Sequence, residues 1–231
     1  MNKRPLYLHE EVLLLALDDE KGTFEPGAWS QPALAGAIIG ELLDGGRLTT
    51  LKDGKREVVK VIKSEPFGEA LLDDYLALIK DSKKSYPAKH WAGVFSVRGD
   101  LIPRTAESLC ALGVLRTDER KVLLFFTRKS YPEVDATYED DLVERLRVTI
   151  FEDDDAIDSR TQMLVAIANQ TRLLQVHFDK KDLAVREGRI KAIVNGDLAG
   201  AATKGAIELA NTAFFMTSVS AMVPIMVMGS R

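Results

Sequence analysis

Apolar residues recur at intervals of three and four along two early stretches, residues 6–17 and 34–48. This spacing places them on one side of an α-helix, so both stretches are predicted to be short helices with a broad buried face. In the first stretch, His9, Glu10 and Glu11 fall together on a polar arc. Small residues thin one side of the second helix, so that another helix can approach closely: Ala35, Gly36, Ala37 and Gly40.

The rest of the chain is predicted to contain one early hairpin and a series of helices. Residues 47–51 and 57–62 have the extended spacing of a β-hairpin around the turn Lys52-Asp53-Gly54-Lys55. Helical spacing continues in further segments: 71–80, 90–97, 102–112, 139–151, 159–177, 182–194 and 204–228. Polar residues and Pro224 interrupt the last, apolar segment, which falls short of the ~20 residues of a membrane span. We therefore expect residues 206–223 to form a central core helix.

These elements predict a mainly α fold class: a compact helical bundle around the apolar C-terminal helix, with a protruding β-hairpin. That hairpin is expected from Val114-Leu115, a polar turn at residues 117–120 and a strand at residues 122–126. Its second strand is apolar on both faces, because four apolar residues are consecutive: Leu123, Leu124, Phe125 and Phe126. One face can pack on the body, and the other is left to water, lipid or another copy. The charged turn disfavours deep membrane insertion, at ~2.5–3.5 kcal/mol for each charge, and favours self-association.

Composition narrows the class of protein further. Residues 1–231 are expected to form a single domain, because no linker interrupts them. The formal net charge of −4 argues against a broad nucleic-acid surface. The single cysteine, Cys110, cannot form an internal disulfide, and residues 1–5 do not begin a signal peptide. A cytoplasmic location is therefore expected, with Cys110 buried and inert.

Candidate catalytic and metal-binding residues are few. The segment that begins at His9 starts like a zinc-protease motif, but Leu13 stands where the second histidine belongs. His90 and His177 are far from His9 in sequence, and all three are interpreted as helix-surface residues. The acidic residues 152–155 are interpreted as a solvated turn, although they could bind a cation. The sequence thus predicts no enzyme, no catalytic residues, no cofactor and no metal site.

Several motifs, taken in order, resemble the Golgi phosphoprotein 3 family. They are LxLxEEVLLLAL from Leu6, LxGAIIxELLxxGRL from Leu34, LLDDYL at 71–76 and GVL…LLFF…YP at 113–132. Each motif alone is weak, but the ordered set is specific. The resemblance implies a mostly helical fold with a central apolar bundle and one protruding β-hairpin. Eukaryotic members are peripheral membrane proteins that bind phosphatidylinositol 4-phosphate and retain Golgi glycosyltransferases through their cytoplasmic tails; bacterial members also exist.

The resemblance also implies a lipid-headgroup site made of an aromatic residue and arginines. Trp29 matches the aromatic residue in the loop before the second helix, and Arg98 and Arg104 lie in the arginine region before GVL. Ala35 stands where the family has the arginine of its LRG motif. An anionic headgroup needs several converging donors, because one exposed arginine contributes little. The family's basic N-terminal extension is also missing, which indicates a bacterial-type member.

Together these features predict a cytoplasmic, peripherally membrane-associated adaptor. It would bind anionic phospholipid headgroups (phosphatidylinositol 4-phosphate in the resembled family) through Trp29, Arg98 and Arg104, and would also bind the cytoplasmic tails of membrane proteins. Its hairpin would make a homo-oligomer contact or a membrane contact. The alternative is a soluble scaffold protein that self-associates through the hairpin without binding lipid. Salt-sensitive binding to anionic vesicles distinguishes the two functions.

Overall fold

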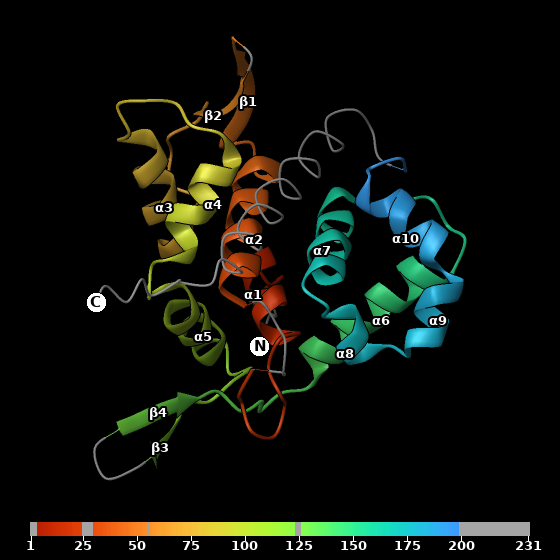
Figure 1. The fold of residues 1–231 in the computed structure, drawn as a ribbon. Helices are drawn as coiled ribbons and strands as arrows, with labels where there is room; N and C mark the ends of the chain where they lie inside the picture. The colour runs from red at the N-terminus through yellow and green to blue at the C-terminus, as the bar shows by residue number, and fades with distance from the viewer. Residues whose placement is uncertain (1–3, 25–29, 55, 123–125, 199–231) are drawn as a thin grey trace, which may run out of the picture.

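The computed structural model describes residues 4–24, 30–54, 56–122 and 126–198 (Figure 1). This part of the chain is mainly helical with two small antiparallel sheets, which confirms the predicted fold class. The helices are α1 (Leu8–Leu14), α2 (Ser30–Asp44), α3 (Ala70–Lys80), α4 (Ala88–Ser96), α5 (Leu101–Ala111), α6 (Thr137–Phe151), α7 (Ser159–Gln170), α8 (Leu174–His177), α9 (Lys180–Val185) and α10 (Glu187–Val194). The predicted central helix at residues 206–223, with Phe214 and Phe215, lies outside the described residues.

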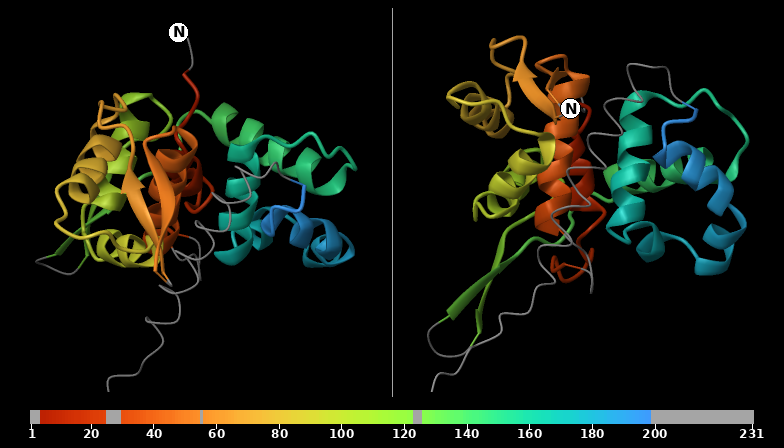
Figure 2. Two further views of the ribbon diagram at one scale, coloured as in Figure 1. Left: turned by 90° about the horizontal axis from the view of Figure 1, so that it is seen from above. Right: turned by 45° about the horizontal axis from the view of Figure 1, so that its top comes forward.

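Helices α1 and α2 lie at the centre of the described part. Helices α3 to α5 pack on one side of them, and α6 to α10 lie on the other side (Figures 1 and 2). Helix α2 is buried over most of its length because its inner positions are aliphatic or small. A Cβ atom on Gly40 would lie 3.2 Å from both Leu8 of α1 and Met163 of α7. The small residues predicted to allow close helix approach therefore do so at Gly40, where three helices meet.

The hairpin that follows α2 confirms the prediction for this region. Helix α2 ends in a Schellman motif: Gly46 has a φ of +64°, and the Arg47 amide donates to the Leu42 carbonyl at 2.9 Å. Strand β1 (Leu48–Asp53) then pairs with β2 (Arg56–Val61). The amide of Val59 donates to the Tyr86 carbonyl at 2.9 Å, which attaches the hairpin to the loop before α4.

The second hairpin exists, but the predicted positions of its strands and turn are wrong. Strand β3 (Asp118–Val122) pairs with β4 (Phe126–Ser130), with Asp118 opposite Ser130. The charged residues 118–120, expected in the turn, therefore belong to a strand, and the expected strand 122–126 includes the last residue of β3 and the first residue of β4. The hairpin projects from the body (Figure 1), so a charged sequence such as DERK can form a strand there without being buried in the core.

The C-terminal helices are shorter than their spacing predicts. The expected helix 159–177 is divided into α7 and α8, and the expected helix 182–194 into α9 and α10. Arg172, between α7 and α8, has a φ of +65°, a left-handed conformation that ends a helix. The Thr171 hydroxyl donates to the Ile167 carbonyl at 2.8 Å and so satisfies a group at the end of α7. The spacing of apolar residues alone does not reveal such a break in a helix.

Candidate functional site

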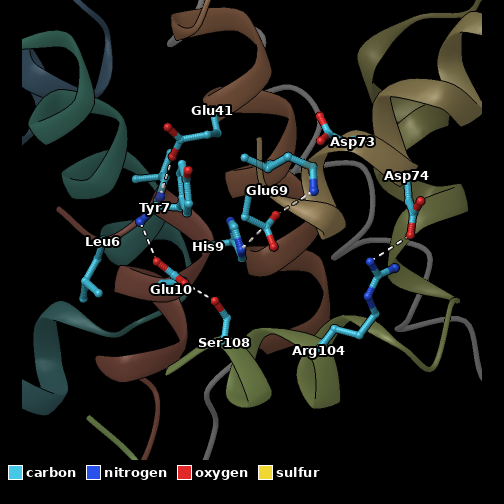
Figure 3. Close-up of polar contacts among 12 residues, drawn as sticks. Leu6, Tyr7, His9, Glu10, Glu41, Glu69, Asp73, Asp74, Arg104 and Ser108 are labelled. Atoms are coloured by element: carbon cyan, nitrogen blue, oxygen red, sulfur yellow. Dashed lines mark hydrogen bonds and ion pairs between the residues drawn. The ribbon is translucent and has the colours of Figure 1, made fainter. Parts of the chain in front are cut away.

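Two of the predicted lipid-contacting residues, Arg98 and Arg104, meet at one carboxylate. Arg104 projects from α5, and Arg98 lies in the turn just before that helix. The Arg98 Nε atom is 3.4 Å from Asp100, and Arg104 Nη1 is 3.6 Å from the same side chain. Arg104 also pairs with Asp74 of α3 at 2.8 Å (Figure 3). The fold thus brings two guanidinium groups together, with their charge balanced by Asp100 and Asp74; we refer to these four residues as the arginine group.

Tyr75 of α3 contacts both Asp100 and Arg98. Its ring is fully buried against Phe95, with the two centroids 4.4 Å apart, while its hydroxyl donates to Asp100 at 2.8 Å. The Arg98 guanidinium lies 5.5 Å from the centroid of the same ring. Burial pushes the pKa of Asp100 up, but the Tyr75 hydroxyl and Arg98 outweigh it, so the net pKa lies below its ordinary value. Asp100 is therefore a fixed negative charge between the two arginines.

The remaining predicted contact residues lie outside the described residues or on the second hairpin. Trp29 lies outside the described residues, as do Leu123, Leu124 and Phe125. Phe126 is the first residue of β4, in the hairpin that points away from the body (Figure 1). Ala35, at the position of the family arginine, is fully buried in α2. The register of β3 and β4 also removes the reason given against membrane insertion, because the charged residues do not form the turn.

A second group of charged residues lies in the centre of the molecule, where the sequence analysis does not place it. His9 and Glu10 of α1 are fully buried and Glu11 is 4% exposed, so the expected polar arc does not face water. Glu10 forms an ion pair with Arg4 at 2.7 Å and accepts the Ser108 hydroxyl at 2.6 Å (Figure 3). Burial alone would raise the pKa of Glu10, but the hydrogen bonds from these donors and from the Tyr7 amide lower it by more. The pKa therefore lies below its ordinary value, and the ionised carboxylate is favoured.

Arg160 of α7 completes this central network. It reaches Glu41 of α2 at 2.9 Å and Glu11 of α1 at 3.3 Å, and Arg145 of α6 reaches Glu11 at 2.8 Å. The Glu41 carboxylate also accepts a hydrogen bond from the backbone amide of Leu8 (Figure 3). The sequence signal is the pair of adjacent acids in an otherwise apolar helix, but both partners of Glu11 are more than a hundred residues away. The geometry indicates a structural role, because each carboxylate is already paired.

The expectations for the cysteine and for His90 are tested by their surroundings. Cys110 is only half-buried, with its Sγ atom 3.6 Å from the Thr117 hydroxyl, so the expected full burial is wrong. His90 is exposed, as expected, and stacks on Tyr86 with ring centroids 4.0 Å apart. Neither residue lies in the arginine group or in the central network.

Comparison with known proteins assigns this fold to a family. The family model described as Golgi phosphoprotein 3 (GPP34) matches residues 8–210, which is most of the chain. The chain belongs to the Golgi phosphoprotein 3 family. This Golgi phosphoprotein 3 domain is also 30% identical to vacuolar protein sorting-associated protein 74 of Eremothecium gossypii over 161 residues, or 61% of the chain. The match spans 48% of that relative, about half its length.

Membership confirms the resemblance stated from the sequence motifs and identifies an adaptor-type family associated with the Golgi. Within the described residues, no helix combines the length and apolar character needed to cross a bilayer. The arginine group around Asp100 thus stands out as the candidate ligand site of this Golgi phosphoprotein 3 domain, because its two cations converge and are partly exposed.

Proposed function

We propose that this Golgi phosphoprotein 3 domain is a peripheral membrane adaptor that binds anionic phospholipid headgroups and the cytoplasmic tails of membrane proteins. Phosphatidylinositol 4-phosphate is the candidate headgroup, by analogy with the family. The observation that carries the proposal is the convergence of Arg98 and Arg104 on the Asp100 carboxylate. A phosphate group offers the same kind of oxygen acceptors as a carboxylate, with more charge and more acceptors.

The ion pairs around Asp100 predict how a headgroup would bind. The side chains of Arg98 and Arg104 are 44% and 28% exposed, so an anion can reach both from solvent. Asp100 and Asp74 balance their charge, so the unliganded group has no excess positive charge. A phosphate must therefore compete with the carboxylates of Asp100 and Asp74 for the arginines. Binding then depends on the number of negative charges on the headgroup. This supports moderate, salt-sensitive affinity rather than tight binding.

Vesicle co-sedimentation tests the proposal. The full chain should bind phosphatidylcholine vesicles that contain phosphatidylinositol 4-phosphate, and less of it should bind as salt is raised. Arg98→Gln and Arg104→Gln should each weaken binding. Arg147→Gln is the matched control, because it removes the same charge from an exposed residue of α6, on the other side of the molecule (Figure 1). Equal binding by the parent and both arginine-site variants would overturn the proposed site.

Asp100→Asn provides a test with the opposite sign. Asparagine keeps an oxygen that can accept the Tyr75 hydroxyl, but it removes the charge that competes with a phosphate. Binding to anionic vesicles should therefore become stronger in this variant. A decrease would show that Asp100 positions the arginines for the lipid rather than competing with it. Vesicles containing phosphatidylserine at equal total charge measure the selectivity for the headgroup.

Self-association through β3 and β4 is a second candidate function. In the described structure these two strands pair only with each other, so both of their outer edges are free to pair with another copy. Replacing Leu123, Leu124 and Phe125 by serine should lower the mass measured by analytical ultracentrifugation if those residues hold copies together. If the parent chain is already monomeric and the variant loses vesicle binding, the same residues contact lipid instead.

A further inference from the structure

Three carboxylates from separate parts of the chain meet at the base of the β3–β4 hairpin. Asp19 lies in the loop after α1, Glu133 follows β4, and Glu139 lies in the first turn of α6. Their oxygen atoms approach so closely that one from each residue lies within 4.8 Å of the others. The cluster is not an acidic run in the sequence, because more than a hundred residues separate Asp19 from Glu133.

Backbone contacts hold the first two residues in place. The Glu133 amide donates to the Asp19 carbonyl at 2.9 Å, and the Tyr131 amide donates to the Gly22 carbonyl at 2.8 Å. A Cβ atom on Gly22 would lie 2.1 Å from the backbone of residues 131 and 132, so the two segments are in direct contact. The positions of Asp19 and Glu133 are therefore fixed by the fold rather than by chance proximity of long side chains.

The cluster lacks the positive partners found elsewhere in the molecule. Arginines neutralise Glu10, Glu11 and Glu41 in the central network, whereas no described lysine or arginine forms an ion pair with Asp19, Glu133 or Glu139. This difference is notable because burial makes an unpaired carboxylate costly. It raises the pKa of Glu133 to about 7 and that of Glu139 to about 8, in both cases with a contribution from Asp19.

Glu139 and Glu133 each present an oxygen that the described protein leaves unsatisfied. Glu139 is only 8% exposed, and no described group donates a hydrogen bond to its carboxylate, which is directed at the other two. The Glu133 Oε1 atom is buried without a hydrogen-bond partner in the described structure. Asp19, by contrast, is exposed, so the cluster opens to solvent on its side. An ion therefore has both unsatisfied ligands and a route of entry.

His177, at the end of α8, also lies beside the cluster. Its Nε2 atom is 2.9 Å from the Leu15 carbonyl, which can only accept, so Nε2 carries the hydrogen. In the neutral ring, the lone pair is then on Nδ1, which lies 3.8 Å from Glu139 Oε1. His177 therefore brings a further potential ligand atom to the edge of the cluster, from an element separate from those that carry the three carboxylates.

From this geometry we propose that Asp19, Glu133 and Glu139 bind a divalent cation of the calcium class, with His177 beside them. One oxygen from each of the three residues lies within 4.8 Å of the others, so a single ion can contact all three. Hard cations take oxygen ligands, and Ca²⁺ accepts a more flexible ligand geometry than Mg²⁺, which demands a near-ideal octahedron. Water supplies the remaining ligands. Bound calcium would join the loop after α1, the base of the β3–β4 hairpin and α6. This site is independent of the arginine group.

Calorimetric titration of the chelator-treated full chain with calcium chloride tests the proposal. One binding event should appear, calcium should raise the thermal unfolding midpoint, and magnesium chloride should bind more weakly. Glu133→Gln and Glu139→Gln should each reduce calcium affinity by about tenfold or more. Without calcium, Glu139→Gln should be at least as stable as the parent, because a neutral group of similar size replaces a buried carboxyl whose ionisation is opposed by burial and by the neighbouring acids. Loss of binding in this folded variant thus separates ligation from misfolding.

Asp140→Asn is the control for these variants. Asp140 is exposed, adjacent to Glu139 and negatively charged, but it is outside the cluster. Its replacement should change calcium affinity by no more than about threefold, the effect of one screened surface charge. The proposal is overturned if the folded parent shows neither binding heat nor a shift in unfolding midpoint with calcium. It is also overturned if Glu139→Gln binds calcium as well as the parent does.

Discussion

His9 is a fully buried histidine whose ring nitrogens have no hydrogen-bond partner in the described structure. Tyr7 stacks on it at 5.9 Å between ring centroids, and its Nε2 atom is 4.0 Å from Glu69, too far for a hydrogen bond (Figure 3). Burial lowers the pKa of His9 from 6.5 to about 4, with Glu10 opposing the change. The folded protein therefore keeps this ring neutral at a pH where the unfolded chain protonates it.

We predict that His9 makes the protein less stable as the pH falls from about 6.5 to about 4. Within this range the unfolded chain binds a proton that the folded chain excludes, so protonation favours unfolding. The loss should reach about 3 kcal/mol at the low end. Urea denaturation of the parent and of His9→Gln across this range measures it. The difference between the two free energies of unfolding should slope with pH, and parallel curves would contradict the prediction.

Single residues also show where a sequence can locate a site and where it cannot. Arg98 and Arg104 could be selected because they precede a recognisable motif, and the fold does bring them together. The burial of Glu10 could not be predicted, because its partner Ser108 is identified only by the packing of α1 against α5. A charged residue in an apolar helix is thus compatible with either an exposed arc or a paired interior.

Among the structural elements, the loop between α1 and α2 depends on its contact with the segment after β4. Gly22 has a φ of +59° and touches the backbone of Tyr131 and Pro132. Gly54, in the turn between β1 and β2, has a similar φ of +61°, but a Cβ atom there would meet nothing within 4 Å. Comparing an alanine substitution at each glycine therefore distinguishes the energetic cost of a left-handed alanine from the cost of steric overlap with a neighbouring segment.

We predict that Gly22→Ala destabilises the protein more than Gly54→Ala does. Both variants place alanine in the left-handed region, which costs roughly 1–2 kcal/mol. Only Gly22→Ala must also displace residues 131 and 132, because its Cβ would overlap their backbone. Thermal and chemical denaturation of the two variants side by side gives the difference. Equal losses of stability would show that the loop moves away from residues 131 and 132 without cost.

Elements with a strong local signal were predictable, and those defined by tertiary context were not. The β1–β2 hairpin was found because Asp53-Gly54 marks its turn between two strand-like runs. In the second hairpin, hydrophobicity suggested a strand and charge suggested a turn, but the register reverses this arrangement. A hairpin that projects from the body need not show the apolar alternation by which strands packed on a core are recognised.

At the scale of the whole molecule, charged contacts join α6 and α7, on one side, to the central helices α1 and α2. Arg160 connects α7 to Glu11 of α1 and Glu41 of α2, and Arg145 connects α6 to the same Glu11. The acidic turn after α6 is likewise held by α10, since Arg189 pairs with Asp155 at 3.0 Å. Sequence reasoning predicted the helices but not these connections, because they join residues distant in the chain.

The last prediction concerns Arg160, which joins three helices. Arg160→Met keeps an apolar stem of similar length but leaves Glu11 and Glu41 buried with fewer positive partners. Removing one partner of a buried ion pair costs about 3–5 kcal/mol, because the remaining charge is uncompensated. Urea denaturation should show this loss as a single transition if the two sides of the molecule unfold together. Lys191→Met is the control, because the side chain of Lys191 is 67% exposed. It should leave the free energy of unfolding nearly unchanged. Equal stability of the two variants would mean that water reaches Glu11 and Glu41, and that packing rather than charge joins α7 to α1 and α2.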